Sequence, residues 1–194
     1  VPTRPWILAS ASPRRRELLG TLGRDFSVLP TAVDESPRPG ERPHSHALRL
    51  AVAKARAAAT SGDASALHIG ADTIVIHAGQ VLGKPCGDAE ATEFLTRLRG
   101  RVHEVATAVA VLDPVGAVLL TGIERTLVWM RDYGDDEMAA YVDSGDPLDK
   151  AGGYAIQNVV FRPVAAIRGS YTNVVGMPLG LTARLLHAHE VDAD

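Results

Sequence analysis

The sequence predicts an α/β protein, because segments with strand patterns and segments with helix patterns follow one another along the chain. Residues 7–9 form a short apolar run that leads into a helix start, residues 45–60 carry alanines at helical spacing, and residues 67–76 are rich in β-branched and apolar side chains. A chain of 194 residues can bury a core as one large domain or as two lobes that share a sheet. Because no linker or repeat divides it, we expect one domain over residues 1–194.

Composition narrows the class of protein. Hydrophobic residues make up 46% of the chain and charged residues 22%, and the formal net charge at pH 7 is −3. These values are typical of globular proteins, and they argue against general binding to nucleic acid or to anionic membranes. No apolar stretch is long enough for a membrane span, and no signal peptide is recognisable. The single Cys86 fits a reducing compartment, so we expect a cytoplasmic protein.

The first helix is predicted to begin at Pro13. Ser12 is a favoured N-cap residue, and proline suits the first helical position because no backbone donor is lost there. Arg14, Arg15 and Arg16 follow in the first turn, where their charges oppose the helix macrodipole unless an anion is bound. Two interpretations stay open, an anion site and a solvated basic helix face.

An acidic pair follows the second predicted strand, residues 26–29. Asp34 and Glu35 lie in a loop over residues 33–43 that contains three prolines and a glycine. Such a pair is either ordinary loop solvation or a source of oxygen ligands for a hard divalent cation.

The clearest helix covers residues 45–60. Lys54 falls beside its alanine face, which is formed by Ala47, Ala51, Ala55 and Ala58, whereas Arg49, Arg56 and Thr60 lie on the opposite face. An unpaired ammonium on an apolar face is costly. Lys54 is therefore expected either to pair with a core carboxylate or to contact a phosphate.

A carboxylate interrupts the strand pattern of residues 67–76. Aspartate is disfavoured in strands and rarely buried without a partner, so we expect Asp72 at a strand end or bulge that faces a polar pocket. Metal ligation or general-base work is favoured over a structural role. A turn at residues 78–79 returns the chain through residues 81–82 to Lys84, towards the end of the hairpin where Asp72 lies.

The remaining segments continue the alternation of elements. The predicted elements are a helix over 88–99 capped by Asp88, a hairpin of strands 102–112 and 117–130 around a turn at 113–116, a helix from Asp135 or Asp136, a strand ending at Gln157, a strand over 159–167, a turn over 169–173, and a helix from Pro178 to about His189. The interpretation of His103 and Glu104 as strand-edge residues is favoured over ligands. His187 and His189 are expected at the surface rather than as a metal pair.

Together these residues suggest chemistry on a polyphosphate. Cations at a helix start, carboxylates at Glu35 and Asp72, and further cations at Lys54 and Lys84 are the groups that such hydrolysis requires. Cations hold the phosphate oxygens, while carboxylates hold a metal and orient water. The pattern by itself does not choose the bond that is broken.

Seven segments, in order, resemble those of the Maf family of nucleoside triphosphate pyrophosphatases. They are residues 8–15, 33–35, 54–55, 70–73, 83–85, 149–157 and 169–179. The resemblance implies an α/β fold similar to that of inosine triphosphate pyrophosphatases, with a mixed sheet flanked by helices and two lobes around a substrate cleft. It also implies cleavage between the α and β phosphates, a divalent metal such as Mg²⁺ or Mn²⁺ and, in many members, a homodimer.

The resemblance also implies roles for particular residues. Asp72 matches the proton acceptor and, with Glu35, the carboxylates associated with the metal. The residues that match the phosphate-handling positions are Ser10, Arg15, Lys54 and Lys84.

Three positions distinguish two branches of that family. The branch acting on dTTP and UTP typically has Arg, Thr and Gln, and the branch acting on 7-methyl-GTP has Trp, Gln and Glu. This chain has Arg14, Thr73 and Gln157, which favours a pyrimidine nucleoside triphosphate as substrate, and a glutamine amide suits a uracil or thymine edge. Asn158 is a departure, because a glycine often follows that glutamine.

The leading hypothesis is therefore a dTTP/UTP pyrophosphatase. An alternative from another class is a nucleotide-sensing regulator of septum formation and cell division, in which hydrolysis is secondary. A third, a purine house-cleaning enzyme of the inosine triphosphate type, rests on fold analogy alone.

Overall fold

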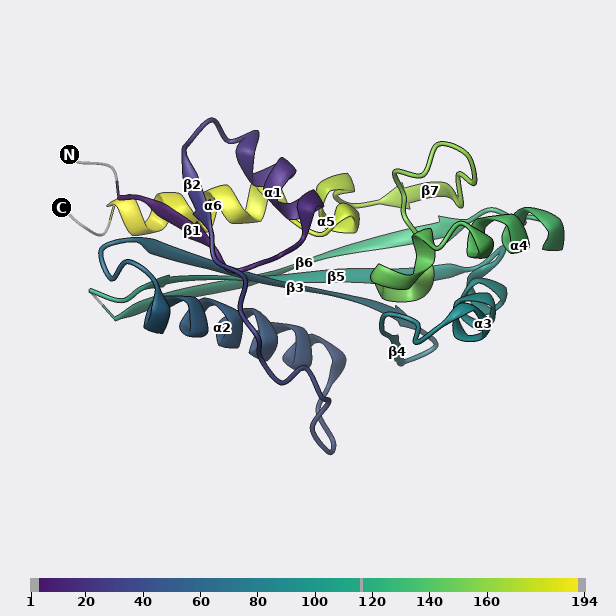
Figure 1. Cartoon of the computed structure of the whole chain (residues 1–194), viewed down its shortest axis with the longest axis horizontal. Helices are drawn as coiled ribbons and strands as arrows, with labels where there is room; N and C mark the ends of the chain where they lie inside the picture. The colour runs from purple at the N-terminus through teal and green to yellow at the C-terminus, as the bar shows by residue number, and fades with distance from the viewer. Residues whose placement is uncertain (1–3, 116, 192–194) are drawn as a thin grey trace. The chain divides into compact units, whose positions relative to one another are not determined.

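The computed structural model describes residues 4–115 and 117–191 (Figure 1). The strands are β1 (Trp6–Leu8), β2 (Phe26–Val28), β3 (Leu67–His77), β4 (Gln80–Leu82), β5 (Val102–Asp113), β6 (Val118–Met130) and β7 (Val164–Arg168). The helices are α1 (Pro13–Gly20), α2 (Pro43–Ser61), α3 (Asp88–Leu98), α4 (Asp135–Asp143), α5 (Tyr171–Val175) and α6 (Leu179–Val191), with 3-10 turns η1 (Asp146–Asp149) and η2 (Ala151–Gly153). Within the described ranges, no helix is long and apolar enough to cross a membrane.

The strands form a mixed sheet in the order β2-β1-β3-β5-β6-β7, with β4 paired to β3. Strand β1 runs parallel to β2 and β3, whereas β4 is antiparallel to β3 and β7 is antiparallel to β6. The predicted α/β class, with a mixed sheet and flanking helices, is confirmed.

The chain divides into two compact units, each with its own core. Unit 1 contains the described parts of Val1–Asp72, Thr107–Glu124 and Gly176–Asp194, and unit 2 contains Thr73–Ala106 and Arg125–Val175. Strands β3, β5 and β6 contribute residues to both units. The single domain with two lobes around a cleft stays a prediction.

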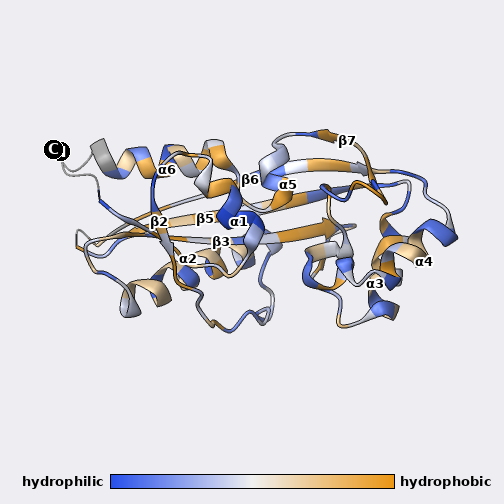
Figure 2. Ribbon diagram, turned by 45° about the horizontal axis from the view of Figure 1, so that its top comes forward, coloured by the Kyte–Doolittle hydropathy of each residue, from blue (hydrophilic) through white to orange (hydrophobic). Residues whose placement is uncertain are grey.

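The core of unit 1 gathers side chains from β1, β3, β5, α1 and α6. Its fully buried members include Leu8, Leu19, Ile69 and Met177. The predicted alanine face of α2 is buried as well, since Ala47, Ala51, Ala55 and Ala58 are each 0% exposed. The first turn of α1 is blue in Figure 2, the colour of hydrophilic residues, because it holds the three arginines.

The core of unit 2 is built around aromatic side chains. The Tyr141 ring stacks on Phe161 with centroids 4.3 Å apart, and Tyr133 packs against the same Phe161 ring at 4.7 Å. Leucines and a phenylalanine of α3 complete this cluster. The segment from the end of α4 to residue 161 is thus joined to the sheet by burial of large aromatic surface.

The segment around Gln157 is not a strand, contrary to the sequence-based expectation. Residues 154–163 form turns, and only Val164–Arg168 remains as β7. Asn158 Oδ1 accepts hydrogen bonds from the backbone of Val160 and Phe161, which closes a turn, and Pro163 has no N–H for a sheet ladder. Local hydrogen bonding by asparagine therefore competes with the strand pattern.

Smaller corrections concern the ends of elements. The N-cap of α3 is Gly87 rather than Asp88, and residues 171–173 of the predicted turn belong to the short helix α5, which continues to Val175. The described part of the turn between β5 and β6 agrees with the prediction, while Gly116 lies outside the described residues. His189 is buried, not superficial, because its Nε2 lies 3.0 Å from the Val111 carbonyl oxygen.

His103 is also buried rather than a strand-edge residue. It is 3% exposed, and its Nε2 lies 2.6 Å from the Tyr154 hydroxyl. Burial, reinforced by the neighbouring His77, lowers the pKa of His103 to about 3. The folded protein therefore holds this imidazole neutral.

This burial predicts acid sensitivity. In the unfolded chain a histidine has a pKa of about 6.5, so between that pH and about 3 the unfolded state binds a proton that the folded state excludes. The free energy of unfolding should consequently decrease as the pH is lowered from about 6.5 to about 3. His103 contributes at most about 1.4 kcal/mol per pH unit to this decrease. Urea unfolding of the wild type and of His103→Gln at several pH values checks this. The variant is expected to show the shallower slope, and equal slopes would contradict the assignment.

Candidate functional site

Helix α1 begins as the sequence predicts. Its first residue is Pro13, and the Ser12 side chain caps it by accepting a hydrogen bond from the Arg15 backbone at 3.4 Å. Ser10 precedes this cap, is 8% exposed, and accepts a hydrogen bond from the Ser12 backbone at 3.2 Å. The hydroxyl of Ser10 is thereby fixed beside the start of the helix.

The Arg15 side chain turns back toward β3. Its Nη1 donates to the Ala71 carbonyl at 2.8 Å and to Ser10 Oγ at 3.3 Å, and its Nε donates to the Gly176 carbonyl at 2.9 Å. Burial lowers the pKa of Arg15, while the negative charge of Asp72 raises it. Three acceptors from separate segments therefore hold this guanidinium in one orientation.

The other arginines of the first turn differ in exposure. Arg14 is half-buried, whereas Arg16 is exposed on the side of α1 that faces an open hollow. The exposure of Arg16 agrees with the interpretation of a solvated basic face. Arg15 does not belong to that face, because its guanidinium donates hydrogen bonds to protein oxygens.

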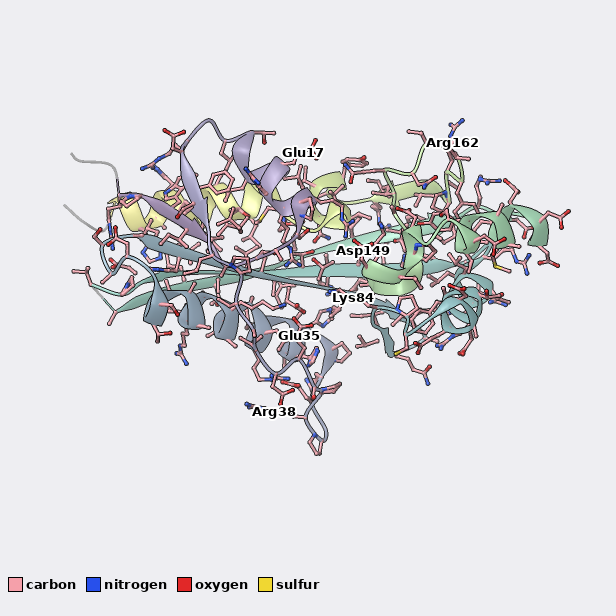
Figure 3. All side chains as sticks on the ribbon, viewed as in Figure 1. Glu17, Glu35, Arg38, Lys84, Asp149 and Arg162 are labelled. Carbon is pink, nitrogen blue, oxygen red and sulfur yellow. The ribbon has the colours of Figure 1, made fainter. Side chains whose placement is uncertain are left out.

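Lys54 joins the two carboxylates that the sequence singled out. Its Nζ lies 2.8 Å from Asp72 Oδ1 and 2.7 Å from Glu35 Oε1. Lys54 and Asp72 are 9% and 8% exposed, while the Glu35 side chain is 53% exposed. Figure 3 shows Glu35 on the loop that precedes α2. The alternative in which Lys54 pairs with a core carboxylate is thus observed.

The sequence predicts Asp72 at a strand end or bulge, because aspartate is disfavoured inside strands. This prediction is wrong. Asp72 occupies the middle of β3, between Ala71 and Thr73. A buried carboxylate is tolerated inside this strand because the Lys54 ammonium compensates its charge. The sequence could not reveal that partner, which comes from a helix 18 residues away.

Gly70 explains how α2 approaches the strand closely enough for this contact. A Cβ at Gly70 would lie 2.1 Å from the Ala51 carbonyl oxygen and 2.7 Å from the Ala55 nitrogen. Only glycine leaves room for the helix backbone here. The same close approach puts Lys54, one residue before Ala55, beside Asp72.

The acidic loop divides into two functions. Asp34 Oδ1 accepts a hydrogen bond from the Ser36 backbone at 2.9 Å, and bonds from Ser36 lower the pKa of Asp34. Asp34 thus shapes the loop, whereas Glu35 reaches Lys54. Within the described parts of the chain, no three His, Cys, Asp or Glu side chains are grouped as ligands for a metal ion.

The structure thus brings Ser10, Arg15, Glu35, Lys54 and Asp72 together in unit 1. Three further predicted residues, Thr73, Lys84 and Gln157, belong to unit 2. Thr73 directly follows Asp72 in β3. Lys84 is exposed two residues beyond β4, whose pairing of Leu82 with Val75 directs the chain back along β3 (Figure 3).

A charged cluster in unit 2 was not among the predicted site residues. Lys150 is 9% exposed, and its Nζ contacts Asp146 Oδ1 at 3.0 Å and Asp149 Oδ1 at 2.5 Å. The scarcity of lysine is the signal that could have found it, because the chain has three lysines among 20 basic residues.

Known proteins resemble this chain in sequence along nearly its whole length. Residues 5–189 match the family described as Maf-like protein. The dTTP/UTP pyrophosphatase of Moorella thermoacetica is 48% identical over 187 residues, covering 96% of this chain and 95% of the relative. Those of Citrifermentans bemidjiense and Burkholderia thailandensis are 46% identical over 173 residues (89% of both chains) and 42% identical over 201 residues (98% of this chain and 96% of the relative). Because the matches span nearly its whole length, this chain belongs to the Maf family.

Proposed function

We propose that this chain is a nucleoside triphosphate pyrophosphatase that hydrolyses dTTP and UTP to the monophosphate and pyrophosphate. The observation that carries the proposal is the buried Lys54 ammonium, which forms ion pairs with Asp72 and Glu35. The guanidinium of Arg15 lies close enough to both carboxylates for their charges to act on it. The names of the relatives, dTTP/UTP pyrophosphatase, support the same activity.

The cations and hydroxyl of unit 1 are suited to bind phosphate. Arg15 has three hydrogen bonds to protein oxygens that keep its guanidinium oriented, and Ser10 Oγ lies beside it. Lys54 supplies a second positive charge that is already desolvated. Lys84 is proposed as a further phosphate-handling cation because its position matches the family motif at residues 83–85. Such preorganised charges favour a transition state in which negative charge develops on the phosphates.

The donor set fits a divalent metal. Glu35 and Asp72 both place an oxygen on one ammonium, so two hard oxygen ligands are gathered at one point. Mg²⁺ typically takes one or two carboxylates and completes its shell with water and substrate phosphates. We therefore assign Glu35 and Asp72 to hold Mg²⁺ or Mn²⁺. When bound, such an ion neutralises phosphate charge and lowers the pKa of a coordinated water.

Asp72 is proposed as the proton acceptor. A water oxygen bonds to the α-phosphorus, the bond from that phosphorus to the oxygen bridging to the β-phosphorus breaks, and pyrophosphate leaves. The water proton passes to the Asp72 carboxylate, which the Lys54 ammonium holds in place at 2.8 Å. Glu35, whose side chain is 53% exposed, is assigned to ligation rather than to proton transfer.

Base selection is assigned to Arg14, Thr73 and Gln157. Gln157 is exposed and offers both a donor and an acceptor, as recognition of uracil or thymine requires. We infer a preference for dTTP and UTP over purine nucleotides from this residue set.

A panel of nucleoside triphosphates tests the function. With Mg²⁺ or Mn²⁺ present, pyrophosphate and the monophosphate are expected from dTTP and UTP at the highest kcat/KM. Faster turnover of 7-methyl-GTP or inosine triphosphate would contradict the substrate assignment. Release of orthophosphate instead of pyrophosphate would contradict the reaction.

A further inference from the structure

Gln157 is carried by a short turn in unit 2. The Asn158 backbone donates to the Ala155 carbonyl at 3.2 Å, so residues 155–158 form one turn with Gln157 exposed near its end. The geometry of this turn decides where the Gln157 amide lies.

One carboxylate oxygen holds both ends of that turn. At its C-terminal end, Asn158 Nδ2 donates to Asp146 Oδ2 at 3.2 Å. At its N-terminal end, the Ala155 backbone donates to the Tyr141 hydroxyl at 3.0 Å, and this hydroxyl donates to the same Asp146 Oδ2 at 2.7 Å. Asp146 therefore accepts from Asn158 directly and is linked to Ala155 through the Tyr141 hydroxyl.

Asp146 is itself held in place. Lys150 Nζ donates to Asp146 Oδ1 at 3.0 Å and to its carbonyl at 2.5 Å. Burial would raise the pKa of Asp146, but hydrogen bonds from Tyr141, Lys150 and Asn158 lower it. The carboxylate thus stays an ionised acceptor, and charge-assisted bonds to it are strong.

The link from Ala155 through the Tyr141 hydroxyl to Asp146, here called the N-terminal arm, is held in place as well. Its ring stacks on Phe161 with an interplanar angle of 15°, and the side chain is buried. A hydroxyl on a ring fixed by packing has little freedom to follow a displaced turn. The N-terminal arm is consequently stiff.

The link from Asn158 to Asp146, here called the Asn158 arm, involves both ends of the side-chain amide in hydrogen bonds. While Nδ2 reaches Asp146, Oδ1 accepts from the Val160 backbone at 3.1 Å and from the Phe161 backbone at 2.7 Å. A glycine at this position would have no side chain for either contact. This arm therefore depends on the Asn158 side chain.

The turn also borders a space that suits a small ring. Gln157 lines an open hollow of about 430 Å³ together with Asn158, Val164 and Tyr171. The Tyr171 ring is 47% exposed, and aromatic faces of this kind stack on nucleobases.

We propose that Asp146 is a positioning residue which, through Tyr141 and Asn158, fixes the Gln157 turn and so sets the preference between pyrimidine bases. The inference rests on the proposed function. Uracil and thymine present an N–H donor beside a carbonyl acceptor, whereas cytosine presents the reverse pattern. A glutamine amide that turns over matches either pattern, so discrimination requires that the amide approach be constrained. The doubly held turn supplies this constraint.

The test uses Asn158→Asp, which is nearly isosteric. The variant keeps the Oδ1 acceptor for Val160 and Phe161 but turns the other end of the side chain into a carboxylate oxygen opposite Asp146 Oδ2. The ratio of kcat/KM for dTTP to that for dCTP is expected to fall about tenfold. The loss should be in KM for dTTP, with kcat changed by less than about twofold, because the phosphate-handling groups of unit 1 are untouched.

Tyr141→Phe is the second variant, and Asp143→Asn is the control. The phenylalanine keeps the ring on Phe161 but loses the hydroxyl, so the ratio should fall as well. Both arms act through Asp146. The fold-decrease of the dTTP to dCTP ratio in the variant that combines Asn158→Asp with Tyr141→Phe should therefore be smaller than the product of the two single fold-decreases. Asp143 is exposed on α4 outside this network, and its variant should keep the wild-type ratio.

The outcomes separate the two claims. If the wild type prefers dTTP and both arm variants keep that preference, the inference is wrong while the function stands. If kcat falls with KM unchanged, the positioning role is wrong. If the wild type releases no pyrophosphate from any nucleoside triphosphate, the proposed function is wrong and this inference with it.

Discussion

Asp72→Asn is expected to lower kcat for pyrophosphate release from dTTP by about 10³-fold, the usual scale for loss of a general base. The amide has nearly the shape of the carboxylate but cannot accept a proton from water. It also removes one of the two negative charges on Lys54, whose Nζ lies 2.8 Å from Asp72 Oδ1. Steady-state kinetics at saturating Mg²⁺ measures the loss.

The fold should survive this change, because Glu35 remains as a partner for the Lys54 ammonium at 2.7 Å. Asp63→Asn is the matched control in unit 1. Asp63 Oδ1 accepts from the Ser65 backbone in an exposed turn, and asparagine can make the same bond. The control should keep wild-type kcat. An Asp72→Asn enzyme with more than about a tenth of that kcat would contradict the role of proton acceptor.

Gly70→Ala is expected to be the most destabilising small substitution in unit 1. The added Cβ would lie 2.1 Å from the Ala51 carbonyl oxygen and 2.7 Å from the Ala55 nitrogen, both of them backbone atoms of α2. A backbone cannot yield as a flexible side chain does, so helix and strand must separate. The free energy of unfolding should fall by about 3 kcal/mol or more, as measured by urea unfolding.

The same variant should lose activity beyond its loss of stability. When α2 moves away from β3, Lys54 moves away from Asp72, because Lys54 lies between the two contacting residues Ala51 and Ala55. Gly20→Ala is the control, since the nearest heavy atom to its Cβ is 3.9 Å away on a Phe26 side chain. Equal stability of the two variants would contradict this account of the helix–strand contact.

Local patterns predicted the elements where nearby residues decide the structure. Ser12 and Pro13 placed the start of α1, and alanine spacing placed the buried face of α2. These signals depend on capping and on helical periodicity, which involve residues within a few positions of one another. The segment around Gln157 was predicted wrongly, because the Asn158 side chain competes for backbone donors that a strand would use.

The candidate site was predicted in its residue types but not in its contacts. A carboxylate within a strand pattern and a lysine on an alanine face each signalled an unusual environment at Asp72 and Lys54. Their pairing joins residues on different elements, and so does the bond from Arg15 to the Gly176 carbonyl, 161 positions along the chain.

By itself, then, the sequence determined the α/β class, the start of the first helix and, by resemblance, the family, and it predicted a set of candidate residues for polyphosphate hydrolysis. Tertiary structure alone decided that Asp72 lies within a strand opposite Lys54 and that Asp146 holds both ends of the Gln157 turn. The physical reason is the same for both: a buried charge is tolerated only where packing brings its partner, and packing depends on elements distant in the chain.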